Sequence, residues 1–364
     1  MMKVVFYRVL EEKSFFSGIK NEINFFKNVN LRMLNINHQK FLELDQLSQQ
    51  KVPFFFVIDF LMENVLIFNE EDLKSKKILV DFPHFKNIEN KEFASKKIEW
   101  QAFSQSKKDY EKGFKIVQEH LKRGDSYLVN YTTETPVETN LTLEEVFYQS
   151  KAKYKVLLNN EFTFFSPETF VEIKNQKIYT HPMKGTIEAE KQNAIELLKN
   201  DVKEKAEHYT VVDLLRNDLS MIADNVQLDE FQRIDYLKTS NKNLYAMSSE
   251  ISGDVKPEFQ YKIGSLFQKI LPAGSILGAP KSKTLEVILE AENYKRGFYT
   301  GVAGCFDGEN LDSCVIIRYI ENKNSLYLNE KPNLVFKSGG GITHLSKLED
   351  EYQEMKNKIY VPIH

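Results

Sequence analysis

Cysteine is almost absent from this chain of 364 residues, since only Cys305 and Cys314 occur. Their spacing matches neither a zinc ribbon nor a CxxC redox motif, and two cysteines cannot make a disulfide framework. The sequence therefore argues against a disulfide-rich scaffold and is typical of a reducing, cytoplasmic setting.

Long apolar runs and an excess of one charge are missing as well. No stretch approaches the roughly 18 uninterrupted apolar residues that a membrane-spanning helix needs. The opening MMKVVFYRVLEEKSFF lacks the basic region and long apolar run of a signal peptide. With 49 basic and 52 acidic side chains the net charge is -3, so bulk charge attracts neither nucleic acid nor an anionic membrane. We expect a cytoplasmic protein that binds neither of them.

Several common catalytic motifs are also lacking. None of the seven histidines lies in an HxxxH or HExxH spacing, and no nucleophile elbow for Ser-His-Asp catalysis is present. The stretch LPAGSILGAPKS superficially looks like a phosphate-binding loop, but Gly278 is followed by Ala-Pro-Lys instead of Lys-Ser/Thr. Zinc-protease, serine-hydrolase and P-loop nucleotide chemistry are therefore disfavoured.

Strand-like and helical patterns alternate from end to end, without a linker or a fixed-period repeat, which predicts one continuous domain over residues 1–364. Residues 53–69 predict a hairpin. Residues 107–123 predict a helix closed by Gly124, and Thr142 with Glu145 predicts the capping box of another.

Hairpin signals recur in the second half of the chain. Turns are predicted at Asn175-Gln176 and at Asp307-Gly308, the latter with LDSCVIIRYI as its return strand. The run SGGGIT predicts a glycine-rich link into a final helix over about 346–358. Strands outnumber helices, so the predicted class is α+β with mainly antiparallel sheets.

Two pairs of glutamates stand out. Glu204 and Glu207 lie three residues apart on one predicted helix, and Glu351 and Glu354 have the same spacing on another. Residues three apart share a helix face, and a few carboxylate oxygens with waters left in place suit Mg²⁺. Taken locally, the same pairs are typical of a solvated helix face.

Glycine-rich links and one arginine offer sites for an anion. A helix that begins at Pro280 or Lys281 would present its positive end after converging backbone N–H groups. The run SGGGIT makes the same offer, although both links could be tight turns. Arg318 lies inside the apolar run VIIRYI, where its charge needs a carboxylate from the protein or from a ligand.

Lys184 is flanked by apolar residues in THPMKGT, at the end of a predicted strand. A surface lysine normally stands in a polar run, where its ammonium stays hydrated. Local chemistry therefore leaves Lys184 as either a turn residue or a desolvated amine.

In their order and spacing, these pieces resemble the chorismate-utilising enzymes, a family that includes anthranilate, aminodeoxychorismate, isochorismate and salicylate synthases. The resemblance covers residues 124–360 and runs through GDSYLVNYT, SPETF, THPMKGT, AEHYTVVDLLRND, LPAGSILGAPKSKTLEVI, RGFYTGVAG, IIRYI and SGGGITHLSKLEDEYQEMKNK. It implies a catalytic core over 101–364, whereas residues 1–100 match loosely, are short for the family and lack an evident tryptophan-binding signature.

The resemblance implies two antiparallel sheets packed face to face, with helices outside and an active site for Mg²⁺ and the dianion chorismate. Glu207 and Glu354 match the family's metal-binding glutamates, with Glu204 and Glu351 alongside. The implied substrate contacts are Thr186, Ser275, Tyr299, Arg318, Gly339 and Gly340. Glu168 matches the general acid that protonates the departing C4 hydroxyl.

Position 184 separates the members of the family. Aminodeoxychorismate synthases often have lysine there, and its amine is proposed to add at C2 of chorismate before ammonia adds at C4. Leu128 stands where relatives have glutamine or a lysine base, and because leucine cannot activate water, isochorismate synthesis is disfavoured. Ala246 stands where the family commonly has a histidine associated with pyruvate elimination, which argues against anthranilate as product.

The resemblance thus implies aminodeoxychorismate synthase component I, which converts chorismate and ammonia to 4-amino-4-deoxychorismate for p-aminobenzoate and folate. No glutaminase nucleophile motif is present, so a glutamine amidotransferase subunit would supply the ammonia. The alternatives are anthranilate synthase component I and, in a different class, a non-catalytic chorismate-binding subunit.

Overall fold

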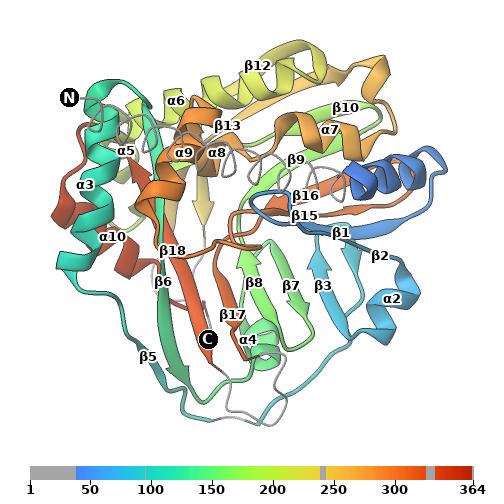
Figure 1. The fold of residues 1–364 in the computed structure, drawn as a ribbon, viewed down its shortest axis with the longest axis horizontal. Coiled ribbons are helices and arrows are strands. Elements are labelled where there is room, and N and C mark those ends of the chain that lie inside the picture. The colour runs from blue at the N-terminus through green and yellow to red at the C-terminus, as the bar shows by residue number, and fades with distance from the viewer. Residues whose placement is uncertain (1–37, 95, 238–242, 325–332, 363–364) are drawn as a thin grey trace, which may run out of the picture.

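The computed structural model describes residues 38–362 except 95, 238–242 and 325–332 (Figure 1). Within these residues the strands form two nine-stranded antiparallel sheets. This confirms the predicted α+β class. We refer to the sheet that contains β1 as sheet A and to the sheet that contains β6 as sheet B.

Sheet A has the order β11-β13-β10-β9-β16-β15-β1-β2, with β12 beside β13. Its strands are β1 (Phe54–Ile58), β2 (Val65–Phe68), β9 (Thr169–Lys174), β10 (Lys177–Thr180), β11 (Met183–Glu188), β12 (Ala223–Leu237), β13 (Leu244–Val255), β15 (Val302–Phe306) and β16 (Leu311–Val315).

Sheet B has the order β14-β6-β18-β17-β8-β7-β3-β4, with β5 beside β6. Its strands are β3 (Ile78–Phe82), β4 (Phe85–Lys86), β5 (Trp100–Ala102), β6 (Leu128–Thr139), β7 (Tyr154–Leu158), β8 (Phe162–Ser166), β14 (Gly278–Ala279), β17 (Tyr319–Asn322) and β18 (Leu334–Ile342).

Helices cover the outer faces of both sheets. Residues 38–49 are helical, followed by α2 (Glu70–Ser75), α3 (Lys107–Arg123), α4 (Leu143–Gln149), α5 (Ala194–Asn200), α6 (Val202–Ser220), the 3-10 turn η1 (Pro257–Phe259), α7 (Ile263–Ile270), α8 (Gly274–Leu277), α9 (Lys281–Ala291) and α10 (Leu348–Asn357). In Figure 1, α3 lies beside β6 at the left, and α6 runs along the top near β13.

Strand alternation sets the layers. In β1, Phe55 and Val57 pack between the sheets with Phe164 of β8. Phe56 faces the other way and packs on Phe267 of α7, with ring centroids 5.1 Å apart. A third cluster joins the outer face of sheet B to α3, α9 and α10. The layers are therefore helices, sheet A, sheet B and helices.

Local signals placed most of the predicted elements correctly. Helix α3 spans Lys107–Arg123 and ends at Gly124, whose φ of 80° is left-handed. Helix α4 begins with the predicted capping box of Thr142 and Glu145. The hairpins β1–β2, β9–β10 and β15–β16 form at the predicted turns. Short-range chemistry was sufficient here because each signal lies within a few residues.

The prediction that LDSCVIIRYI forms a single return strand is wrong. It is divided between β16 of sheet A and β17 of sheet B, and residues 316–318 carry the chain across. Arg318 adopts a left-handed φ of 56° at the end of this crossover. Because the run is apolar on both faces and contains neither glycine nor proline, its pattern carries no sign that the strand changes sheets.

Candidate active site

Helix α6 carries the first glutamate pair to two different strands. Its N-cap, Asp201, accepts a hydrogen bond from the Glu204 backbone N–H at 2.9 Å. A Cβ atom built on Gly185 of β11 would lie 3.0 Å from Glu204 Oε2, and one built on Gly341 of β18 would lie 3.7 Å from Glu207 Oε2. One turn of α6 therefore links the strand that contains Lys184 to the glycine run.

The glycine run is part of a strand, which corrects the prediction of a link before the last helix. Residues Ser338 to Ile342 belong to β18 and pair with Thr133 to Val129 of β6. Its outer neighbour is Glu354 of α10, whose Oε1 would lie 3.1 Å from a Cβ on Gly340. The absence of side chains lets a carboxylate approach the strand backbone closely.

Gly339 and Gly340 should respond differently to alanine. A Cβ on Gly339 would lie 2.4 Å from the backbone oxygen of Tyr131, whereas one on Gly340 meets the movable carboxylate of Glu354. We expect Gly339→Ala to lower the free energy of unfolding by about 1–3 kcal/mol, because β6 and β18 must shift apart. Gly340→Ala should leave it within about 0.5 kcal/mol. Urea denaturation of both variants checks this, and equal losses would contradict it.

The two glutamates of the second pair face different neighbours: Glu354 faces β18 and Glu351 faces α3. Glu354 Oε1 accepts a hydrogen bond from Lys358 Nζ at 2.7 Å, and the same ammonium donates to Gly339 O at 2.9 Å. Glu351 is buried. Burial first, then the charge of Glu351, raises the pKa of Tyr110 in α3, which places this carboxylate beside α3.

Lys184 and Thr186 lie in β11 as the sequence predicted for the end of a strand region. Thr186 is in register with Ala246 of β13, Met183 is in register with Ser248, and the register shifts between them. The intervening Gly185 has a left-handed φ of 82°. The side chains of Lys184 and Thr186 are outside the described part of the structure, so their roles stay predictions.

Glu168 and Ser275 are brought together from distant parts of the chain. The Ser275 hydroxyl donates to Glu168 Oε1 at 3.0 Å, joining the β8–β9 link to the four-residue helix α8. The predicted acid thus has a polar partner from a second element, which fixes its orientation.

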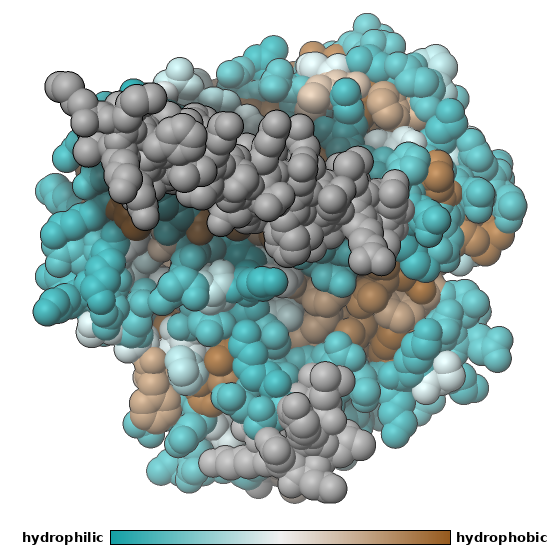
Figure 2. Space-filling model, in the orientation of Figure 1, coloured by the Kyte–Doolittle hydropathy of each residue, from teal (hydrophilic) through white to brown (hydrophobic). Residues whose placement is uncertain are grey.

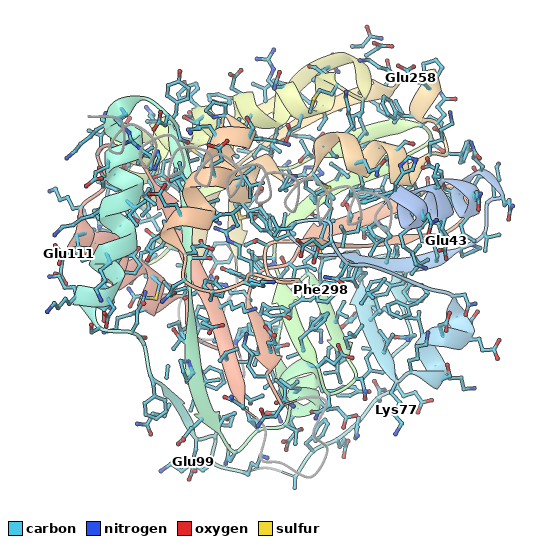
Figure 3. The ribbon with its side chains drawn as sticks, in the orientation of Figure 1. Glu43, Lys77, Glu99, Glu111, Glu258 and Phe298 are labelled. Carbon is cyan, nitrogen blue, oxygen red and sulfur yellow. The ribbon has the colours of Figure 1, made fainter. Side chains whose placement is uncertain are left out.

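Tyr299 lies in the link between α9 and β15, next to Phe298, which is labelled near the centre of Figure 3. Burial raises the pKa of Tyr299, and the charges of Arg296 and Arg318 oppose that rise. Glu168 also acts on this pKa, which places Tyr299 near the predicted acid. The hydroxyl therefore stays protonated at neutral pH and is available as a donor.

Arg318 is half-buried, and among the described residues no carboxylate pairs with it, which leaves the ligand carboxylate that the sequence also allowed. Its Nη1 instead donates to the backbone oxygen of Lys358 at 2.8 Å, and its guanidinium lies 4.8 Å from the centre of the Tyr360 ring. Lys358 in turn bonds Glu354 and Gly339. Arg318, Lys358 and the glycine run therefore form one connected group with two cations.

Leu128 and Ala246 are both buried. A Cβ on Gly341 would lie 3.0 Å from Leu128 Cδ1 and 3.7 Å from Glu207 Oε2. Leu128 therefore presents an apolar surface beside the Glu207 carboxylate.

Carboxylates suit Mg²⁺, but in the described part of the chain no group of three or more His, Cys, Asp or Glu side chains is arranged to hold a metal ion. The fit instead comes from the chemistry of the donors. Glu207 and Glu354 approach neighbouring glycines of one strand from two helices, and hard oxygen donors of this kind are those that Mg²⁺ prefers. At Glu354 the ammonium of Lys358 occupies a position on the carboxylate where a metal cation could bind.

A cavity of about 620 Å³ lies elsewhere, beside β1, β2 and the β15–β16 turn. Figure 2 shows apolar side chains gathered on this face near those strands. Its lining includes Phe55, Phe68 and Asp312 but none of the predicted site residues. The candidate active site is therefore distinct from this cavity. No helix in the described ranges has both the length and the apolar character needed to cross a membrane.

The chain matches the model of the chorismate binding enzymes over residues 31–364, and it belongs to that family. It is 43% identical over 327 residues to an uncharacterised PabA-like protein of Pasteurella multocida, which covers 90% of this chain and 99% of that protein. It is 27% identical to aminodeoxychorismate synthase component 1 of Escherichia coli, covering 83% of this chain and 66% of that protein. With anthranilate synthase component 1 of Saccharomyces cerevisiae the identity is 30%, covering 70% and 51%.

Solved structures support the same fold. The structure of a putative 2,3-dihydroxybenzoate-specific isochorismate synthase of Bacillus anthracis superposes with a TM-score of 0.63 at 18% identity, covering 90% of this chain and 88% of that one. Anthranilate synthase component I of Streptococcus pneumoniae gives 0.59 at 26% identity, covering 72% and 58%. The predicted fold of this family is confirmed.

Sequence reasoning missed two residues of the site. Lys358 lies four residues after Glu354, so their shared helix face was a usable signal. Arg296 precedes the glycine of RGFYTG and is buried, and nothing local to that motif indicated its contacts.

Proposed function

We propose that this protein is an aminodeoxychorismate synthase component I, which converts chorismate and ammonia to 4-amino-4-deoxychorismate and water. The observation that carries the proposal is the link made by α6, where Glu204 borders the strand of Lys184 and Glu207 borders the glycine run. The helical turn from Glu204 to Glu207 thus runs between the strand that contains position 184 and the glycine run, which supports a shared site for a dianionic substrate.

The first step would use Lys184 and Glu168. The Lys184 amine adds to C2 of chorismate, the two ring double bonds shift toward C4, and the C4 hydroxyl leaves as water with a proton from Glu168. A covalent intermediate divides one difficult displacement into two allylic steps. The amine must be neutral to attack, although the pKa of a free lysine is about 10.4. It therefore needs desolvation or a nearby cation to lose its proton, and the sequence flanks it with the apolar Pro182 and Met183.

In the second step ammonia adds at C4, the double bonds shift back, and the Lys184 amine is released. Arg318 and Lys358 supply positive charge for the substrate carboxylates, and Tyr299 supplies a hydroxyl donor. Glu207 and Glu354 would hold Mg²⁺, with Glu204 and Glu351 alongside, and when bound the ion neutralises substrate charge. Leu128 leaves no base to activate water at C2.

Ammonia would come from a separate glutamine amidotransferase, because the sequence has no glutaminase nucleophile motif. Such a partner is expected to replace ammonium salts in the assay. This part of the proposal can be checked separately, since the synthase reaction itself needs only ammonia.

The product assay decides between this function and anthranilate synthesis. Pure protein is incubated with chorismate, Mg²⁺ and ammonium. We expect no anthranilate fluorescence and, after addition of aminodeoxychorismate lyase, formation of p-aminobenzoate. Strong anthranilate formation without the lyase would contradict the proposal, and chorismate binding without turnover would indicate a non-catalytic subunit.

A further inference from the structure

We infer that Arg296, together with Asn130, is a positioning residue that holds Ser275 against Glu168. This inference rests on the proposed role of Glu168 as the acid. Ser275 belongs to α8, which contains only four residues and is too short to hold itself in place through its own backbone hydrogen bonds. Its position must therefore come from contacts with neighbouring elements.

The end of α8 is held through one backbone oxygen, that of Ile276, directly after Ser275. It accepts hydrogen bonds from Asn130 Nδ2 at 2.8 Å and from Arg296 Nη1 at 3.4 Å. Two donors from different elements hold the peptide group between Ile276 and Leu277, one residue after Ser275, and so limit the movement of the turn that carries the Ser275 side chain.

The start of α8 lies against a charged pair. Lys281 Nζ lies 2.8 Å from Asp218 Oδ1, and Asp218 Oδ2 would lie 3.0 Å from a Cβ atom built on Gly274. Burial raises the pKa of Asp218 and lowers that of Lys281, and the pairing of the two charges opposes both shifts. This pair joins the C-terminal end of α6 to α9 and leaves the Ile276 end to Arg296 and Asn130.

The guanidinium of Arg296 is itself held by buried hydrogen bonds. Its Nε and Nη2 form two hydrogen bonds to Glu292, at 2.8 and 2.6 Å, and both side chains are 2% exposed. Glu292 also accepts from the backbone N–H of Thr132 at 2.8 Å. A forked pair of this kind sets the guanidinium plane, so Nη1 can face only one direction.

Arg296 also fixes the other side of the site. Its backbone oxygen accepts from the Tyr299 N–H at 3.2 Å, and Nη1 donates to the hydroxyl of Thr300 at 3.2 Å. The same residue thus sets Tyr299 relative to the Ser275–Glu168 pair. Its charge is paired with that of Glu292. We therefore assign it a role through these neighbours and not through contact with substrate.

The test is a double-mutant cycle measured as chorismate consumption, which does not depend on the identity of the product. Asn130→Ala removes one donor to Ile276 and leaves the Arg296–Glu292 pair intact. We expect it to lower kcat about 5–10-fold, the cost of one hydrogen bond, with KM for chorismate within about twofold. In a Ser275→Ala background the same substitution should change kcat less than about twofold.

Arg296→Lys keeps a positive charge beside Glu292 but loses the two parallel hydrogen bonds of the guanidinium. Like Asn130→Ala, it should change kcat less in the Ser275→Ala background than in wild type. Lys155→Met is the matched control, because it breaks another buried pair, with Asp81 at 3.1 Å, without touching α8. It should lower the free energy of unfolding. Its effect on kcat should be the same factor in the wild-type and Ser275→Ala backgrounds.

Equal factors for Asn130→Ala in both backgrounds would overturn the inference, even if Arg296→Lys failed to fold. An unchanged kcat in Ser275→Ala would overturn it together with the role of the Ser275–Glu168 pair. Anthranilate as product would overturn only the proposed function, because the cycle follows substrate loss.

Discussion

Lys184→Ala is expected to abolish amination, with the rate of aminodeoxychorismate formation falling on the order of 10³-fold or more, as when other covalent nucleophiles are removed. In the proposed mechanism the bond to C2 is assigned to Lys184, because Leu128 is apolar and Glu168 protonates the leaving hydroxyl. The rate is measured with saturating ammonium, so that ammonia supply is not limiting.

A direct observation of the intermediate strengthens this test. Wild-type protein with chorismate and Mg²⁺ but no ammonia should gain the mass of chorismate less one water, located on Lys184 by peptide mapping. Lys177→Ala serves as the matched control, because Lys177 is a nearby lysine of β10 whose ammonium lies against Tyr179. It should retain both adduct and rate. An adduct that persists in Lys184→Ala would remove the nucleophile role.

Glu207→Gln and Glu354→Gln form the second large prediction. Each should weaken Mg²⁺ binding at least about 100-fold, because even the outer partners of metal ligands contribute roughly 10–100-fold. Calorimetric titration of Mg²⁺ into protein and chorismate, with every variant made in a Lys184→Ala background, measures this without adduct formation. Glu349→Gln is the matched control in α10, since Glu349 is exposed and pairs with Lys107.

The two variants should differ in one respect. Glu354 holds the ammonium of Lys358, which the proposal assigns to the substrate carboxylates. We therefore expect Glu354→Gln also to release this ammonium and to strengthen chorismate binding when Mg²⁺ is absent, whereas Glu207→Gln leaves the Glu354–Lys358 pair intact. Mg²⁺ affinity that is unchanged in both variants would remove the metal site from these residues.

The fold was predictable wherever its signals were local. Gly124 and the Thr142–Glu145 capping box end or begin helices through contacts a few residues long. The glycine run was misplaced because glycine is a poor strand former, and its strand is imposed by pairing with β6. The sequence cannot show that long-range partner without the fold.

The site was predictable only in part for the same reason. The spacing of Glu204 and Glu207 indicated a shared helix face, but the strands that they border lie more than 100 residues apart in the chain, at Gly185 and Gly341. Arg318 was expected to need a carboxylate from the protein or from a ligand, and among the described residues it bonds a backbone oxygen. Arg296 escaped notice because partners such as Asn130 and Ile276 lie far from it in the chain.

Helix α6 also acts as a ruler for the active site. Its rise of about 1.5 Å per residue separates Glu204 from Glu207 by about 4.5 Å along the axis. That spacing sets the distance between the two carboxylates, one beside Gly185 and the other beside Gly341. Inserting a single residue between them would turn one carboxylate by about 100° and away from its strand. A substitution that leaves Glu204 and Glu207 in place therefore keeps this spacing, whereas a change in helix length at this turn does not.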